Sequence, residues 1–277
     1  MSGDTGVWAY AITEHSHLSR PDGDVDLSWL TGVGEAKVRT TSCEGLTVLV
    51  SDVTLAEFGE AALRRNLEDL DWLDEVAREH HYVIDAAARL FPLLPTRLAT
   101  IYASDAALCG ALASRQDQLR DALRRVGGRV EWGVKVYPAP GADKAERASA
   151  SGDRADAGAG QDAEPGGGAG LAYLQRRRGQ LTSDREVKGA AVSAAQAMHT
   201  DLTAKATDTR LHPPQSAQLS GIRQPMLLNA AYLTDAADGP TFTAAVGGLA
   251  TAHPELRVEL TGPWPPYSFA GDDDDGH

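Results

Sequence analysis

Alternating apolar and polar positions predict two β-strands in the second half of the chain. Residues 129–137 (RVEWGVKVY) and residues 256–261 (LRVELT) both place an apolar side chain at every second position. A period of two is typical of a strand with one buried face. We expect the two strands to be neighbours in one sheet, although 118 residues lie between them.

The beginning of the chain predicts a strand followed by a β-hairpin. Residues 7–12 (VWAYAI) are apolar almost throughout, as in a mostly buried strand. Residues 36–41 and 46–53 then form the two arms of a hairpin. Gly45 lies in the turn between them, where a positive φ angle suits glycine.

Apolar residues at helical spacing predict two long helices after the hairpin. Residues 54–57 (TLAE) fit a capping box that opens a helical region. Apolar positions then recur every three or four residues through 67–91, as in an amphipathic helix of about six turns. Residues 95–102 form an extended connector. A second helix is capped by Ser104 and ends at the Gly127–Gly128 pair.

The second half predicts the element order strand, helix, strand, strand, helix, strand. Its first strand is followed by residues 139–170, which contain no aromatic and no branched aliphatic side chain and therefore predict a disordered loop. Residues 171–206 then predict a long helix. The remaining elements are an edge strand at 208–216, a central strand at 224–234 and a helix at 241–253. This order is that of a ferredoxin-like domain, in which the first and last strands are adjacent.

The predicted fold class is therefore α+β with two domains. A helix-rich α+β domain spans residues 1–128. A ferredoxin-like domain spans residues 129–271 and is interrupted by the disordered loop 139–170. Residues 272–277 form an acidic tail that contains four consecutive aspartates.

Composition narrows the classes of partner and compartment. The chain has 277 residues and a net charge of −13, which argues against nucleic acid as the main partner. No run of apolar residues approaches the length needed to span a bilayer, and the N-terminus has no signal-peptide pattern. We therefore expect a cytoplasmic protein without a membrane partner. Cys43 and Cys109 are expected to be buried thiols, with a disulfide as the alternative.

The residues that most often carry catalysis or metal binding form no recognisable motif. His80 and His81 are consecutive on a helix and point about 100° apart, so they cannot bind one metal ion from one face. There is no HExxH, no CxxC and no glycine-rich phosphate loop. The basic triplet at residues 176–178 is expected to be a solvated helix face rather than a phosphate site. We expect no catalytic, cofactor-binding or metal site.

The aromatic and proline residues near the C-terminus are the candidate binding residues. Residues 261–269 (TGPWPPYSF) are expected to leave the sheet at Thr261–Gly262 in an extended, polyproline-like form. In one interpretation, Trp264 and Tyr267 fold back and seal the core. In the other they form a partner-binding surface. The candidate partner-binding residues are Arg97, Trp264, Pro265, Tyr267 and Phe269, and Arg97 needs a charged partner if it is buried.

At these residues the sequence resembles the gas vesicle protein family GvpL/GvpF. The two most specific matches are EWGVKVY at residues 131–137 and TGPWPPYSF at residues 261–269. Shorter matches occur at residues 7–12, 46–53, 66–72 (NLEDLDW), 92–102, 172–178 (AYLQRRR) and 228–233 (LNAAYL). In the connector 92–102 the chain keeps Arg97 but departs from the family pattern in the residues that follow it.

The resemblance implies an accessory protein of gas vesicle assembly and not an enzyme. Its implied partners are the hydrophobic major shell protein and other vesicle accessory proteins, in the cytoplasm and on the vesicle. A folded partner that covers the apolar face of a shell subunit would prevent aggregation before polymerisation. Two alternatives remain open: a structural component of the vesicle wall, and a small-molecule binder or enzyme on a ferredoxin-like scaffold.

Overall fold

The protein combines helices and strands in two compact units. The computed structural model describes residues 5–19, 23–66, 68–139, 178, 188–215, 221–222 and 224–271. Unit 1 contains Met1–Glu131, Leu233–Ala236 and Gly262–His277, and unit 2 contains Trp132–Tyr232 and Ala237–Thr261. The chain therefore returns twice to unit 1 after leaving it. The predicted domains have a single boundary, after residue 128, and contain no such return. The α+β fold class is confirmed.

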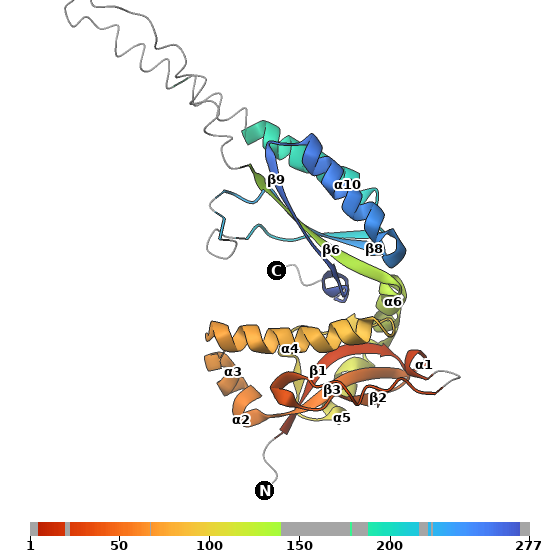
Figure 1. The fold of residues 1–277 in the computed structure, drawn as a ribbon. Coiled ribbons are helices and arrows are strands. Elements are labelled where there is room, and N and C mark those ends of the chain that lie inside the picture. Colours follow the sequence, from red (N-terminus) through yellow and green to blue (C-terminus); the bar gives the residue numbers. More distant parts are fainter. Residues whose placement is uncertain are drawn as a thin grey trace, which may run out of the picture. The chain divides into compact units, whose positions relative to one another are not determined.

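Unit 1 contains an antiparallel sheet with the first strand near its centre (Figure 1). The strand order is β2-β3-β1-β4, and β5 also pairs with β1. The strands are β1 (Thr5–Glu14), β2 (Arg39–Cys43), β3 (Leu46–Thr54), β4 (Leu94–Pro95) and β5 (Ile101–Tyr102). Because β1 pairs with neighbours on both edges and packs on both faces, its residues are apolar almost throughout. The predicted hairpin is confirmed, with Gly45 at φ +88° in its turn.

The helices of unit 1 differ from the prediction in their boundaries. They are α1 (His15–Leu18), η1 (Val33–Glu35), α2 (Leu55–Phe58), α3 (Glu60–Asn66), α4 (Leu70–Ala88), α5 (Asp105–Ala113) and α6 (Gln116–Val126). The capping box predicted at residues 54–57 is wrong, because Thr54 makes no side-chain capping bond. Asp69 instead caps α4 by accepting from the backbone N–H groups of Asp71 and Trp72.

The second predicted helix is divided in two, while its start is confirmed. The hydroxyl of Ser104 accepts from the backbone N–H of Ala107 and caps α5. Helix α5 ends at Ala113, and α6 begins at Gln116. The connector before α5 is extended at its two ends, where β4 and β5 form two-residue strands on β1.

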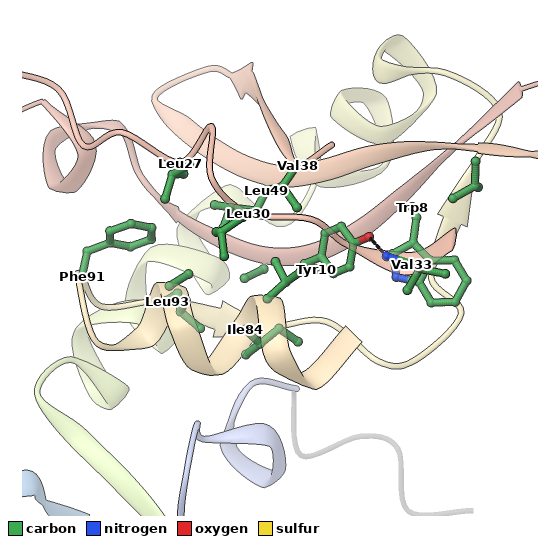
Figure 2. Packing of buried hydrophobic residues seen from close by; sticks show 14 of the residues in the cluster. Trp8, Tyr10, Leu27, Leu30, Val33, Val38, Leu49, Ile84, Phe91 and Leu93 are labelled. Carbon is green, nitrogen blue, oxygen red and sulfur yellow. Dashed lines mark hydrogen bonds between the residues drawn. The ribbon is translucent and has the colours of Figure 1, made fainter. Parts of the chain in front are cut away.

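The core of unit 1 lies between the sheet and α4 (Figure 2). Trp8 and Tyr10 of β1 contribute its largest buried side chains, and α4 contributes the fully buried Val83, Ile84 and Ala87. The segment between α1 and β2 adds further buried side chains to the cluster, namely Leu27, Leu30, Val33 and Val38. Burial of this apolar surface is the main stabilising contribution of the unit.

A network of hydrogen bonds satisfies the polar atoms inside this core. The indole Nε1 of Trp8 donates to Nδ1 of His80, which fixes the imidazole as the tautomer that carries its hydrogen on Nε2. That Nε2 lies 3.2 Å from the carbonyl oxygen of Thr96. The hydroxyl of Tyr10 lies 2.7 Å from the Oγ of Ser51 and accepts from the backbone N–H of Val33 (Figure 2). Burial lowers the pKa of His80 to about 4.

The two cysteines form a disulfide, which corrects the expectation of buried thiols. Cys43 ends the edge strand β2, and Cys109 lies in α5. The same two elements are joined by an ion pair in which both guanidinium nitrogens of Arg39 lie 2.9 Å from the carboxylate oxygens of Asp105. Helix α5 is therefore fixed to the sheet edge by one covalent and one electrostatic connection.

Unit 2 is built on a four-stranded sheet with the order β7-β8-β6-β9. The strands are β6 (Arg129–Pro138), β7 (Asp208–Leu211), β8 (Leu228–Asp235) and β9 (Leu256–Trp264), with η2 (Ala236–Asp238) after β8. The predicted pairing of the first and last strands is confirmed, because β6 and β9 are neighbours. Residues 188–203 and α10 (Gly239–Ala252) are helical and cover one face of the sheet (Figure 1).

The end of β9 differs from the prediction. The strand does not break at Thr261–Gly262 but continues through Pro263 to Trp264. A proline is tolerated there because β9 is an edge strand, whose outward N–H groups have no ladder partner to lose. The short helix η3 (Tyr267–Phe269) follows it.

Several predicted segments lie outside the described residues. These are residues 140–170 of the predicted disordered loop, most of the first half of the predicted helix 171–206, and the acidic tail 272–277. Within the basic triplet at 176–178, only Arg178 is described, and it is helical and exposed.

Candidate functional site

The C-terminal segment, which we define as residues 263–270, packs against helix α4 within unit 1. The hydroxyl of Tyr267 lies 3.0 Å from Nδ1 of His81. The ring of Trp264 meets the imidazole of His81 edge-on, with 5.3 Å between ring centroids. His81 is partly buried and contacts both aromatic residues of the segment.

The same segment is fixed by a buried carboxylate. The side chain of Glu131 accepts from the backbone N–H of Ser268 at 2.7 Å and from its hydroxyl at 2.6 Å. A nearby guanidinium, that of Arg125, donates to the carbonyl oxygen of Phe269 at 3.0 Å. Burial raises the pKa of Glu131, and its two hydrogen bonds from Ser268 oppose this shift. Burial also raises the pKa of Tyr267, with Asp85 and Glu131 adding to the effect.

A groove of about 610 Å³ lies beside the segment and is lined by residues of unit 1. Its apolar lining includes Leu90, Pro92, Val126, Val130, Pro263 and Trp264. Four charged side chains also line or flank it, but they pair with one another. Arg89 lies 2.7 Å from Asp85, and Arg129 lies 2.9 Å from Asp235. The groove therefore offers a mainly apolar surface whose charges are locally balanced.

Comparison with known proteins identifies the family. Residues 6–271 match the family described as gas vesicle synthesis protein GvpL/GvpF. The chain is 38% identical to gas vesicle protein L of Streptomyces sp. (strain CB03234) over 271 residues, covering 98% of this chain and 95% of that protein. The chain belongs to the GvpL/GvpF family. It is therefore a gas vesicle protein involved in gas vesicle formation.

Two further comparisons concern the F proteins of the family. Gas vesicle protein F of the same Streptomyces strain is 28% identical over 267 residues, covering 95% of this chain and 98% of that protein. A crystal structure of the gas vesicle protein GvpF from Anabaena sp. PCC7120 matches with a TM-score of 0.63 at 22% identity, covering 99% of each chain. The solved structure supports the fold, and the sequence identities are higher for the L protein than for the F protein of one organism.

The candidate residues of this GvpL/GvpF member are not equally accessible. Trp264 is 41% exposed, and Tyr267 is partly buried against the core cluster of unit 1. Tyr267 thus has the burial that the core interpretation requires, and Trp264 has the exposure that the partner-binding interpretation requires. Phe269 is 0% exposed, and Pro265 is buried but lines the groove. Arg97 is exposed on the connector and is not among the described groove residues.

The residues that position this site carry weak signals in the sequence. Glu131 occupies a polar position of an alternating strand, which predicts exposure, yet it is only 8% exposed. His81 is one of two consecutive histidines, and the helical period does not decide which one faces the core. The only signal for Glu131 is that it begins the family motif EWGVKVY.

The described part of the chain contains neither a metal-binding cluster nor a membrane-spanning helix. Within it, no group of three or more His, Cys, Asp or Glu side chains is arranged to hold a metal ion. Its helices also include none that is both long and apolar enough to cross a bilayer.

Proposed function

We propose that this GvpL/GvpF member is an accessory protein of gas vesicle assembly that binds the hydrophobic major shell protein. The observation that carries the proposal is the apolar groove whose wall includes the exposed indole of Trp264. An exposed tryptophan beside a groove is typical of residues that contribute strongly to protein binding. A shell subunit with a large apolar face would aggregate unless such a partner covered it.

The charge distribution favours an apolar protein segment over a small polar ligand. Binding sites for polar small molecules usually contain a few convergent polar groups that are free to form hydrogen bonds with the ligand. Here the charged groove residues are already paired, Asp85 with Arg89 inside the groove and Arg129 with Asp235 beside it. An apolar helix or strand could occupy the groove without breaking either ion pair. An assembly role is therefore better supported than an enzymatic one.

The same proposal includes the context in which the protein acts. We propose that it works in the cytoplasm and at the growing vesicle, together with other vesicle accessory proteins. The higher identity to a protein L than to a protein F of one organism supports assignment to the L branch.

We also propose that residues 129–271 contain a ferredoxin-like domain. Its support is the strand order β7-β8-β6-β9, with the helices at 188–203 and α10 in the connections between strands. The domain would follow a helix-rich domain that spans residues 1–128. The support for a cytoplasmic location is indirect, because family membership gives the process, gas vesicle synthesis, and not the compartment.

The test is co-purification of the tagged protein with the major shell protein, co-expressed in a host that lacks other vesicle proteins. Trp264→Ala is expected to reduce the co-purified shell protein at least about tenfold, since loss of a central aromatic contact typically costs 2 kcal/mol or more. Trp29→Ala is the matched control, because Trp29 is 51% exposed and does not line the groove. A single substitution is preferable to one that includes Tyr267, whose partly buried ring also stabilises the fold.

Each outcome has a distinct meaning. Shell protein retained by the wild type and by Trp29→Ala, but lost with Trp264→Ala, supports the proposal. Equal loss in both tryptophan variants, or equal retention, contradicts the assignment of the groove. If the folded wild-type protein retains no shell protein, the structural-component alternative is favoured instead.

A further inference from the structure

Only half of the groove wall formed by residues 263–266 belongs to regular secondary structure. Pro263 and Trp264 end strand β9, while Pro265 and Pro266 belong to no helix or strand, and all four line the groove. Prolines lack the N–H that could bond to a neighbouring strand or helix. The position of Pro265 and Pro266 therefore depends on the residues that follow them.

The residues that follow contact His81 through Tyr267 and Arg125 through Phe269, and they bind the carboxylate of Glu131 by two hydrogen bonds. Both of its oxygens accept from Ser268, one from the backbone N–H at 2.7 Å and one from the hydroxyl at 2.6 Å. Hydrogen bonds to an ionised acceptor are about twice as strong as neutral ones. The carboxylate is nearly inaccessible to water, so each lost bond would leave a buried polar group unpaired.

Glu131 also lies next to both walls of the groove in sequence or through Ser268. Its neighbour in strand β6, Val130, lines the groove directly, and Pro266 lies two residues before Ser268. The two walls of the groove are thus connected through one pair of side chains, although they come from parts of the chain more than 130 residues apart.

We infer that Glu131 is a positioning residue that, through Ser268, holds the groove wall of residues 263–266 in the geometry that binds the apolar partner. We call the Glu131–Ser268 pair the latch. This inference rests on the proposed function, because it assigns a role to the latch in binding the shell protein at that same groove. Loss of the latch leaves the chain folded, frees residues 263–270 and removes the binding surface.

The experiment measures amide hydrogen exchange and shell-protein binding in the same variants of the full chain. Glu131→Ala and Ser268→Ala break the latch from its two sides. In Glu131→Gln the amide oxygen accepts from the Ser268 N–H and its NH₂ group donates to the hydroxyl, so this variant is expected to preserve the latch. Glu57→Ala, at an exposed position of α2, is the control for loss of a carboxylate.

The expected result is faster exchange in peptides from residues 262–271, by about tenfold, and a similar loss of co-purified shell protein in both latch-breaking variants. Exchange in peptides from β1 and α4 is expected to stay at the wild-type rate, which excludes general unfolding. Glu131→Gln and Glu57→Ala should match the wild type in both measurements.

Other results would overturn the inference in recognisable ways. Unchanged exchange in residues 262–271 would show that Glu131 does not hold the segment. Faster exchange with full binding would show that the groove tolerates a released wall, so Glu131 has no positioning role. If Trp264→Ala leaves binding intact, the groove itself is wrongly assigned, while the exchange data still decide whether the latch exists.

Discussion

The indole Nε1 of Trp8 donates a hydrogen bond to Nδ1 of His80 across 3.0 Å in the core of unit 1. This bond requires a neutral imidazole at Nδ1, because a protonated ring carries hydrogens on both nitrogens and cannot accept. Protonation of His80 therefore breaks the bond and places a charge in a site that is almost closed to water.

Stability is expected to fall as the pH decreases from about 6.5 to about 4. The pKa of His80 is lowered from 6.5 to about 4 in the folded protein. Between these values the unfolded chain binds a proton that the folded chain excludes, so protons favour unfolding. The contribution is full above pH 6.5, and about 3 kcal/mol of it is lost by pH 4. Urea unfolding across this pH range measures the effect.

His80→Gln separates this contribution from those of other titrating groups. The glutamine oxygen can accept from Trp8 and its NH₂ group can donate to Thr96, without a proton uptake in this range. The variant should lose part of the dependence of unfolding free energy on pH between 6.5 and 4. An unchanged dependence would mean that His80 is not the group responsible.

The Cys43–Cys109 disulfide predicts a simple chemical result. Protein purified without reductant and then denatured should contain no free thiols by reaction with a chromogenic disulfide reagent, and two after reduction. The double variant Cys43→Ser, Cys109→Ser should unfold with about 2–5 kcal/mol less free energy, because the cross-link no longer restricts the unfolded chain. Two free thiols in the unreduced protein would contradict the pairing.

The cap of helix α4 predicts that Asp69 and Thr54 respond differently to substitution. Asp69→Ala should reduce the free energy of unfolding by about 1 kcal/mol, because two backbone N–H groups lose their acceptor. Thr54→Ala is the control, since Thr54 makes no capping bond. Chemical unfolding compares the two variants. An equal effect of both substitutions would support the capping box that the sequence predicts at residues 54–57.

The contact between β6 and β9 predicts a pair of compensating substitutions. A Cβ atom at Gly133 would lie 2.6 Å from the Oγ1 of Thr261, too close for two heavy atoms. Gly133→Ala should therefore cost about 1–3 kcal/mol of unfolding free energy. Adding Thr261→Ala removes the clashing oxygen and should recover most of the loss. A double variant as unstable as the sum of the single variants would exclude this contact as the cause.

Local patterns predicted the elements better than their ends. The period-two alternation located β6 and β9, and the element order predicted that they pair. Helical spacing identified α4, but the Thr54–Glu57 motif obscured the true cap at Asp69, since both motifs place an acceptor before free N–H groups. The break between α5 and α6 could not be predicted in this way, because no proline or glycine lies between the two helices.

The candidate site could be predicted only in part, because it depends on contacts between distant residues. The aromatic character of residues 263–267 predicted either a seal over the core or a binding surface, but a local pattern cannot show which ring is buried. Trp264 is exposed and Phe269 is enclosed in a segment that contacts α4 through His81 and α6 through Arg125. The burial of Glu131 has the same origin, because its partner Ser268 lies 137 residues later in the chain.

The return of the chain to unit 1 has a consequence for the timing of synthesis. Residues 263–270 leave the ribosome only after every residue of unit 2 has been translated. Until then Glu131 has no Ser268 to bind, and the groove lacks one wall. A growing chain therefore cannot display the complete apolar surface. Under the proposed function, the order of the sequence itself would delay capture of a hydrophobic partner until translation is nearly finished.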